Sequence, residues 1–526
     1  MPRGDIHVPI APPLLGIRSA LPKHLVPEGY LVDGQNVLPR NGVIVVRPGM
    51  ARLTSSAPSA NRVMGGIDYR DNTQTQRTVV GTVSTLHSFD GSVWSADIAG
   101  SALTGGSSDQ IRFSVFPFGA TTRLVAVNDV DSPRVWTGSG NFSALGGSPP
   151  IAKSVTTAFQ RMILGNVTVS GTRRGSSLWI SDFQNPANWP SVNQVDLPDT
   201  GDVIVEVQVL NTQSFAIYKE NSQWIGIGAG NVFPFIFELR GLQPGPVSPA
   251  SVVRAESLHF YVGNDGNVYQ FDGNAVTAIG TQIRSLIYND MDWTNKARTH
   301  GFYDAINKEL WWFWPSGRAS GEVWSGIVYR MPYLDIPAAF SPLMQFGVSP
   351  TISFPWFDSN SSSWNGLSSY TWDGASFIST YPTWDSFPRS NTLGALVGDT
   401  AGAVFRIGQQ GGDDGAAIDA IWELPLRPVV GDGFIAQLDV IESFFKNTTS
   451  ALNASVTAIT SNTLGDTGTQ ETAQTIALNS SGTKLRATYE NTTGRFLGVR
   501  YRINSVDALT EYRGGVAYCY KRNEGT

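Results

Sequence analysis

The sequence predicts an all-β protein: a β-propeller of about six to eight four-stranded blades, with an N-terminal arm and a C-terminal β-sandwich. Three observations lead to this prediction. Charged residues make up only 15% of the 526 residues, and 55 glycines and 30 prolines favour tight turns between short strands. Apolar runs that end in glycine turns recur about every 40 to 50 residues, the length of one blade. Near residue 420 the pattern changes to alternating strands separated by Ser/Thr/Asn/Gly-rich loops.

These changes divide the chain into three regions. Residues 1–60 are Pro-rich and irregular, and we interpret them as an arm that docks on something. The arm contains one short strand, from Val43 to Val46, between an Asn-Gly turn and a Pro-Gly turn. Residues 61–420 are assigned to the propeller and residues 421–526 to the β-sandwich.

The segment that begins at Val203 predicts one antiparallel meander of four strands. Its first strand alternates, which is the period of a half-buried strand with one face toward the core. The valines share one face and the other residues share the opposite face: Val203, Val205, Val207 and Val209 against Ile204, Glu206 and Gln208. The runs "SFAIY", "QWIGI" and "FPFIFELR" follow at short intervals.

The segment "YVGNDGNVYQFDGN", Tyr261 to Asn274, repeats this pattern and predicts the inner hairpins of another blade. Its two turns end in Gly266 and Gly273, because a short hairpin needs a positive φ at that position. One helical pattern follows within residues 281–291, where the apolar residues Ile283, Leu286 and Ile287 share a face.

Composition excludes several function classes. With 37 basic and 43 acidic residues the net charge is −6, and the sequence has no basic stripe of the kind that binds nucleic acid tightly. The pair Arg173-Arg174 is interpreted as part of a solvated turn. A single cysteine, Cys519, allows no internal disulfide bond and is expected to be buried. No run of 18 apolar residues occurs, so we expect that the chain does not insert into a membrane and that it assembles in the cytoplasm.

Candidate chemical sites are few. The histidines lie far apart, which argues against a zinc site; they are His7, His24, His87, His259 and His300. Neither the segment 261–274 nor "GGDDGAA" at 411–417 has the ligand pattern of a calcium loop, so both are interpreted as structural turns. "SFDGSVW" at 88–94 lacks one residue of the box found in sialic-acid-cleaving propellers. We therefore assign no catalytic, cofactor-binding or metal-ligating residue and predict no cofactor.

An aromatic cluster is the most unusual local feature. Trp364, Trp372 and Trp384 each precede a polar and then a small residue within a Ser-rich stretch. Two interpretations stay open. The indole rings stack on sugars, or each Trp fills the junction of a strand and a turn, as mostly buried Trp residues do.

Several collinear segments resemble the tail hub or nozzle proteins of short-tailed bacteriophages, which include the packaged-DNA stabilisation proteins. They begin with "NVLPRNGVIVVRPG" and continue with "LWISDFQNPANWP", "FAIYKENSQWIGI", "ELRGLQPGPVSPASVV" and "FYVGNDGNVYQFDG". They end with "YDAINKELWWFWP", "GDTAGAVFRI" and "LGVRYRINS". Each match is degenerate, but together they span most of the chain in one order.

The resemblance implies a structural virion protein of the viral tail, without enzymatic activity. It implies a β-propeller with a β-sandwich, assembled as a homohexameric ring at the head-tail connection, below the portal and adaptor proteins. Such a ring retains the packaged DNA, conducts double-stranded DNA without sequence preference during DNA ejection, and anchors tail fibre, spike or needle proteins. A mildly acidic chain suits such a conduit, because phosphate contacts would hold the DNA tightly.

Two alternatives stay open. The first is a glycan-binding or polysaccharide-cleaving propeller, such as a receptor-binding or depolymerase tail protein. The Trp cluster is the feature that supports it. The second is a cytosolic scaffold propeller, which is disfavoured because the chain lacks the Gly-His and Trp-Asp signature of such blades.

Overall fold

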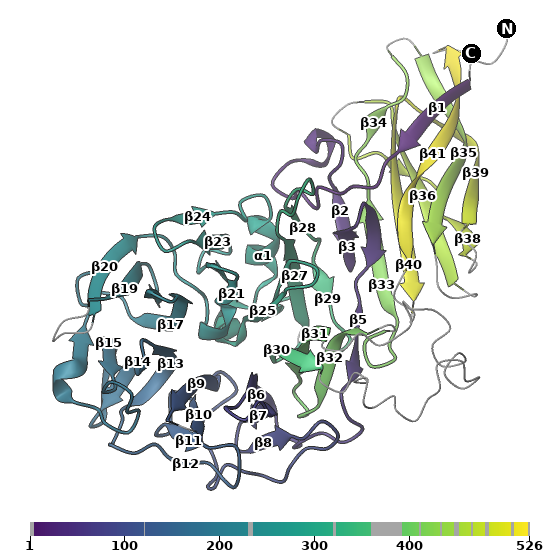
Figure 1. Cartoon of the computed structure of the whole chain (residues 1–526). Helices are drawn as coiled ribbons and strands as arrows, with labels where there is room; N and C mark the ends of the chain where they lie inside the picture. Colours follow the sequence, from purple (N-terminus) through teal and green to yellow (C-terminus); the bar gives the residue numbers. More distant parts are fainter. Residues whose placement is uncertain are drawn as a thin grey trace.

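The computed structural model consists almost entirely of β-strands, as the sequence predicts (Figure 1). It describes residues 5–119, 121–229, 235–318, 322–358, 392–409, 412–431, 434–446, 452–463, 466–478, 483–505 and 510–523. The α-helix of this part is α1 (Arg284–Asp290), in the segment predicted to be helical. The 3-10 turns are η1 (Lys23–Leu25), η2 (Ser191–Asn193), η3 (Pro249–Ser251) and η4 (Trp293–Arg298). None of the described helices is long and apolar enough to span a membrane.

Seven antiparallel sheets surround one axis and form a seven-bladed β-propeller (Figure 1), which confirms the predicted propeller. Blades one to three are β6 (Val63–Arg70), β7 (Gln76–Thr82), β8 (Leu86–Phe89); β9 (Arg112–Phe118), β10 (Thr121–Val127), β11 (Arg134–Trp136), β12 (Ser143–Ala144); and β13 (Ile151–Ala158), β14 (Arg161–Val169), β15 (Thr172–Ile180), β16 (Gln194–Asp196). Blades four and five are β17 (Ile204–Asn211), β18 (Ser214–Lys219), β19 (Gln223–Gly228), β20 (Phe235–Gly241); and β21 (Val253–Ala255), β22 (Leu258–Val262), β23 (Val268–Phe271), β24 (Val276–Ala278). Blades six and seven are β25 (His300–Asp304), β26 (Glu309–Pro315), β27 (Trp324–Arg330), β28 (Ala339–Phe340), β29 (Met344–Gln345); and β30 (Ile352–Asp358), β31 (Thr392–Gly398), β32 (Val404–Gln409), β5 (Gly49–Arg52).

The N-terminal segment closes the ring of blades. Strand β5 is the outer strand of blade seven, where Met50 pairs with Ile407 and Arg52 pairs with Phe405. The other three strands of that blade come from residues 352–409, so the two ends of the propeller meet in one sheet. The backbone hydrogen bonds of this sheet therefore join parts of the chain that lie about 350 positions apart, much as a full barrel removes its edges by closure.

Apolar residues fill the spaces between neighbouring blades. One buried cluster joins blades two and three through Phe116, Val125, Met162 and Leu164, and similar clusters join the other neighbours. A blade interior to the ring is thus covered on both faces. Each interface contributes hydrophobic stabilisation of about 25 cal/mol per Å² of buried apolar surface.

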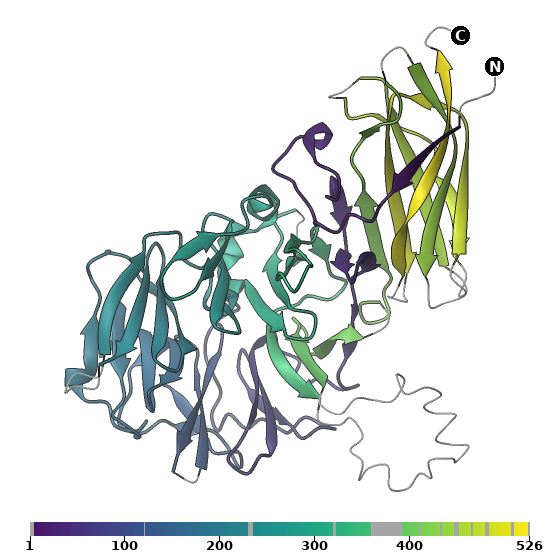
Figure 2. The same cartoon turned by 45° about the horizontal axis from the view of Figure 1, so that its top comes forward.

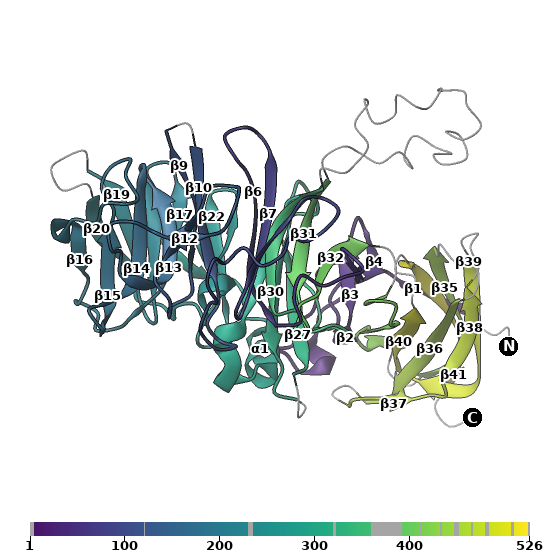
Figure 3. The ribbon, with the colours of Figure 1, turned by 90° about the horizontal axis from the view of Figure 1, so that it is seen from below.

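Two further sheets lie beside blades six and seven (Figure 2). One contains β1 (Asp5–Ile10), β3 (Val37–Arg40), β4 (Val43–Val46), β35 (Phe434–Lys446), β39 (Thr483–Gly494) and β41 (Glu511–Asn523). The other contains β2 (Asp33–Gln35), β33 (Ile418–Glu423), β34 (Arg427–Pro428), β36 (Leu452–Ser461), β37 (Thr469–Gln470), β38 (Gln474–Leu478) and β40 (Phe496–Ser505). We call these two sheets the C-terminal sheets. Figure 3 shows the strands of the two sheets lying against each other. Buried aromatic rings join them, such as Tyr501 against Tyr512 with centroids 4.8 Å apart.

The N-terminal region, expected to be a docking arm, pairs with strands of its own chain. Within residues 5–46, the strands β1, β3 and β4 belong to one C-terminal sheet and β2 belongs to the other. The docking partner of this segment is therefore its own chain. The expected regions were 1–60, 61–420 and 421–526. In the structure, strands from the first of these regions lie in the C-terminal sheets and in blade seven.

Two local predictions need correction. The segment Tyr261–Asn274 forms the β22–β23 and β23–β24 hairpins, but the innermost strand of that blade is β21, so these are its middle and outer hairpins (Figure 1). The alternation from Val203 onward predicts a half-buried strand, but β17 is buried on both faces, with Glu206 on one and Val207 on the other. A blade packs on both faces, so alternation along its strand does not separate core from solvent.

Candidate functional site

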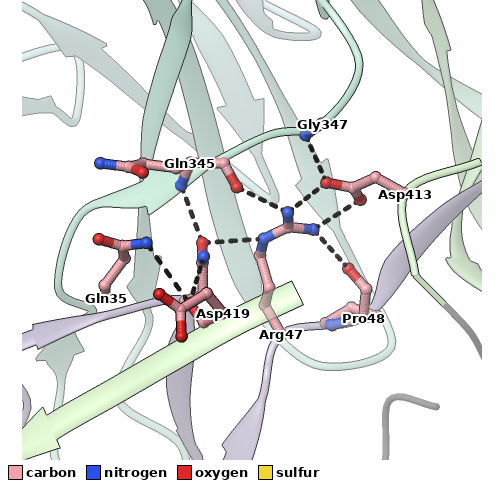
Figure 4. A network of polar contacts seen from close by, with 8 residues as sticks. Gln35, Arg47, Pro48, Gln345, Gly347, Asp413 and Asp419 are labelled. Atoms are coloured by element: carbon pink, nitrogen blue, oxygen red, sulfur yellow. Dashed lines mark hydrogen bonds and ion pairs between the residues drawn. The ribbon is translucent and has the colours of Figure 1, made fainter. Parts of the chain in front are cut away.

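The best-defined polar site surrounds Arg47, in the Arg-Pro-Gly segment between β4 and β5 (Figure 4). Its side chain is only 1% exposed. Strand β4 belongs to a C-terminal sheet and β5 to blade seven, so Arg47 lies where the chain passes from one unit to the other.

All five N–H groups of this guanidinium are used. Nε donates to Asn36 Oδ1 at 3.0 Å, and Nη1 donates to Asp413 Oδ1 at 2.9 Å and to the Pro48 carbonyl at 3.2 Å. Nη2 donates to the Gln345 carbonyl at 2.6 Å and to Asp413 Oδ2. Since a guanidinium has five donors and no acceptor, this buried cation is fully satisfied.

The partners of Arg47 hold three parts of the chain together. Asp413 also accepts from the Gly347 backbone N–H at 2.7 Å, and Gly347 follows β29 of blade six. Asn36 donates to the Asp419 carbonyl on β33 at 2.9 Å and accepts from the Gln345 N–H at 2.8 Å. Blade six, the N-terminal segment and the start of the C-terminal sheets therefore meet at one buried ion pair.

Further ion pairs surround this junction. Arg40 on β3 donates Nε and Nη2 to the two oxygens of Glu309 on β26, at 2.7 and 2.5 Å. Burial lowers the pKa of Arg40, but Coulomb attraction and hydrogen bonding to Glu309 outweigh it, so the pKa is raised overall. Lys23, in the N-terminal segment, donates from Nζ to Glu423 Oε1 on β33 at 3.0 Å. These contacts fix positions; none of them places a nucleophile beside a base.

Buried histidines join neighbouring blades. His259 on β22 contacts Tyr218 Oη of blade four through Nδ1 at 2.9 Å and the Val209 carbonyl through Nε2 at 3.0 Å. His300 on β25 contacts Ser353 Oγ of blade seven and the Pro350 carbonyl, each at 2.8 Å. Burial lowers the pKa of each imidazole to about 3. Both rings have two partners and lie inside blade interfaces, so we interpret them as structural.

The Asp-Gly turns also have structural roles. Asp272 accepts from the backbone N–H groups of Asn274 and Ala275, at 2.7 and 2.8 Å, and these bonds lower its pKa. Asp90, in "SFDGSVW", accepts from the N–H groups of Ser92 and Val93 in the same manner. In the segment 412–417, Asp413 binds Arg47 and Asp414 pairs with Arg52. Across the described ranges, no group of three His, Cys, Asp or Glu residues could hold a metal ion.

The remaining sequence candidates lie apart. Cys519 is buried as expected, and Arg173 at the start of β15 pairs with Asp129 and with Asn166. Trp364, Trp372 and Trp384 fall in 359–391, outside the described residues. The sequence did not point to Arg47, Asn36 or Asp413 as site residues. The Arg-Pro-Gly and Asp-Asp-Gly segments that contain Arg47 and Asp413 lie far apart, and no sequence pattern indicates that they meet.

Comparisons with known proteins support the fold class alone. No protein-family model matches the chain. No curated protein matches it either. Among solved structures, BamB from Moraxella catarrhalis has 10% identity and a TM-score of 0.35, covering 72% of this chain and 96% of its own. The Pan2 WD40 domain of Neurospora crassa has 10% identity and a TM-score of 0.37, covering 69% and 95%. The exo-beta-1,3-galactanase of Phanerochaete chrysosporium has 9% identity and a TM-score of 0.27, covering 84% and 100%. At these identities and TM-scores the similarities say nothing about function. The chain is shown to be a β-propeller and no more.

Proposed function

We propose that the chain is a structural virion protein, one subunit of a ring-shaped tail hub or nozzle below the portal and adaptor. In this role the ring retains packaged DNA, conducts it during ejection and anchors fibre or needle proteins. The proposal starts from the ordered resemblance of segments such as "NVLPRNGVIVVRPG" to the tail hub proteins of short-tailed bacteriophages.

The observation that carries the proposal is the junction at Arg47. That segment of the resemblance ends in Arg47-Pro48-Gly49, and its arginine joins the propeller to the C-terminal sheets through Asp413. A fully satisfied buried polar network favours one relative position of the units it joins. A subunit that must keep a ring closed while DNA passes through it requires such a fixed geometry.

Charge is compatible with this role. The chain has a net charge of −6, so a conduit built from it would repel phosphates rather than bind them. A closed ring requires a heterologous interface, in which two different faces of each subunit meet.

Electron microscopy of the purified full-length chain, alone and with portal and adaptor proteins of the same virus, tests the proposal. We expect rings with a central hole that cap the portal–adaptor complex. A chain that stays monomeric or trimeric and clears a bacterial polysaccharide would overturn it in favour of a glycan-cleaving propeller. An Arg47→Met variant should form fewer rings, whereas Arg52→Met, which removes an exposed pair, should assemble normally.

A further inference from the structure

A cavity of about 460 Å³ lies between blade six and the β3–β4 hairpin. Its walls come from the turn at Asn41, the turn that carries Ile306 and Lys308, the end of β27 at Arg330, and the turn from Tyr333 to Ile336. Cavities of this size, located where two structural units meet, commonly bind small ligands or side chains of a partner.

Large apolar side chains surround this cavity and remain exposed. Leu334 is 86% exposed and Ile306 is 58% exposed, and Tyr333 and Ile336 are exposed as well. Single exposed apolar residues are normal, but a contiguous group around a cavity marks an interaction surface.

The turn that displays Leu334 is tight and unfavourable for leucine. The Tyr333 N–H donates to the Ile336 carbonyl at 3.1 Å, and the Ile336 N–H donates to the Tyr333 carbonyl at 3.0 Å. Leu334 has a φ of +52°, in the left-handed region that Gly and Asn occupy more readily. The fold thus holds a large apolar side chain in solvent by way of a strained backbone, and such strain is concentrated at functional sites.

The charges that line the cavity are mostly positive. Arg40, Lys308 and Arg330 line it, against a single carboxylate, Asp335. Two further carboxylates lie just outside the lining, where Glu309 pairs with Arg40 and Glu256 pairs with Lys308. Arg40 gives only Nε and Nη2 to Glu309, so its third nitrogen, Nη1, takes no part in that pair.

Arg330 adds a positive charge without a carboxylate of its own. Its Nη1 donates to the Pro39 carbonyl, and its Nη2 donates to the carbonyls of Leu14 and Pro337 at 3.1 and 3.0 Å. Among the described residues it forms no ion pair and its Nε has no hydrogen-bond partner, although Glu309, which pairs with Arg40, also attracts its charge. Lys308, on the more exposed side, pairs with Glu256, whose side chain is itself mostly in solvent. An anion that enters the cavity would meet three cationic side chains, of which Arg330 alone is in no ion pair among the described residues.

We propose that this cavity docks an extended peptide segment of a partner protein in which a Glu or Asp side chain is flanked by bulky apolar residues. The apolar residues would cover Leu334 and Ile306. The carboxylate would accept hydrogen bonds from Lys308 Nζ and Arg40 Nη1, with the charge of Arg330 behind them. The proposal rests on the described cavity and does not depend on the assembly of a ring.

Selection of peptides on the immobilised full-length chain tests the proposal. A library of displayed random heptapeptides is expected to yield sequences with Asp or Glu within two positions of an aromatic or aliphatic residue. Replacing that carboxylate by its amide in the selected peptide should weaken binding by about tenfold or more, since a charge-assisted hydrogen bond is lost. Failure to enrich any sequence, or enrichment of basic peptides, would overturn the proposal.

Variants of the chain separate docking from folding. Leu334→Asn removes the apolar side chain but suits the left-handed φ, so it should keep or raise the melting temperature while weakening peptide binding about tenfold. Lys308→Gln should weaken binding to carboxylate peptides without changing binding to their amides. Val192→Ser is the matched control, because Val192 is also exposed but lies in blade three.

Two further outcomes would also contradict the proposal. Selected peptides that bind the Leu334→Asn variant as tightly as the original chain would place their site elsewhere. Concentration-dependent dimerisation of the chain, abolished by Leu334→Asn, would assign the surface to a second copy. Ring formation is measured separately by microscopy, so failure of this proposal and failure of the proposed function are distinguishable.

Discussion

Arg47 and Asp413 lie 366 positions apart in the sequence and form a buried ion pair with two points of contact. Two close neighbours along the same segments, Arg52 and Asp414, form a second pair at 2.9 Å that is largely exposed. The two pairs thus join the same parts of the chain with the same chemistry and differ in burial. This makes them a natural comparison of what burial does to an ion pair.

Replacing Arg47 with Met is expected to lower the free energy of unfolding by about 3 to 5 kcal/mol, because Asp413 is left buried without its cation. The same change at Arg52 is expected to cost about 1 kcal/mol or less, since an exposed pair contributes little. Urea unfolding followed by tryptophan fluorescence measures both variants. Equal losses for Arg47→Met and Arg52→Met would contradict the central role of the buried network.

Closure of the propeller by β5 gives a second prediction. Met50 is buried between blades six and seven, and Met50→Ala should lower the free energy of unfolding by about 2 to 5 kcal/mol. Hydrogen exchange should speed up first at the amides of β32, its partner strand. Leu239→Ala on β20, an exposed site of blade four, serves as control and should change stability by about 0.5 kcal/mol or less. Unchanged exchange in β32 would show that β5 does not hold the ring closed.

Local pairing could be predicted from the sequence, and distant pairing could not. Turns such as Asp272-Gly273 mark hairpins whose partners lie within a few residues, and their regular spacing predicts the blades. The pairing of β5 with β32, or of Arg47 with Asp413, leaves no periodic signal, because each partner follows an ordinary local pattern. The docking of the N-terminal segment on its own chain was therefore beyond sequence reasoning.

Glu206 shows why the faces of the blade strands were also hard to predict. Alternation along β17 predicts a half-buried strand, yet Glu206 is buried and pairs with Arg112 of blade two at 3.0 Å. In a propeller both faces of a blade pack on neighbours, so a polar residue on either face must find a partner. That partner lies two blades away from Glu206, and the local sequence does not reveal it.

The buried histidines predict how stability depends on pH. Burial lowers the pKa of His259 and of His300 to about 3, so both rings stay neutral in the folded chain while the unfolded chain takes up protons below about 6.5. The contribution of these two histidines to the free energy of unfolding is therefore fully present above pH 6.5. It falls as the pH drops toward 3, by up to about 1.4 kcal/mol per pH unit for each histidine.

Some carboxyl groups act in the opposite direction. Burial raises the pKa of Glu206, Asp68 and Asp399, which favours the folded chain as the pH falls through their range. Urea unfolding of the original chain and of His300→Asn is compared at pH 7.5 and 5.5. The contributions of these carboxyl groups cancel in the comparison, because both chains contain them. The variant should lose less stability than the original chain between the two pH values. An equal loss in His300→Asn would show that His300 does not contribute to the pH dependence.

The glycines of the segment Tyr261–Asn274 give the last prediction. Gly266 has a φ of +77° and Gly273 a φ of +94°, both in the region where β-branched residues are strained. A Cβ at Gly266 would lie 3.0 Å from the Cβ of Tyr288, and one at Gly273 would lie 2.7 Å from Leu210 Cδ2. Replacing either glycine with Val should therefore lower the free energy of unfolding by about 1 to 3 kcal/mol. Gly394→Val is the matched control, because Gly394 lies within β31 and a Cβ there meets nothing within 4 Å. Thermal unfolding of the three variants should order them with Gly394→Val nearest the original chain, and unchanged melting temperatures for both turn variants would mean that these turns tolerate a side chain.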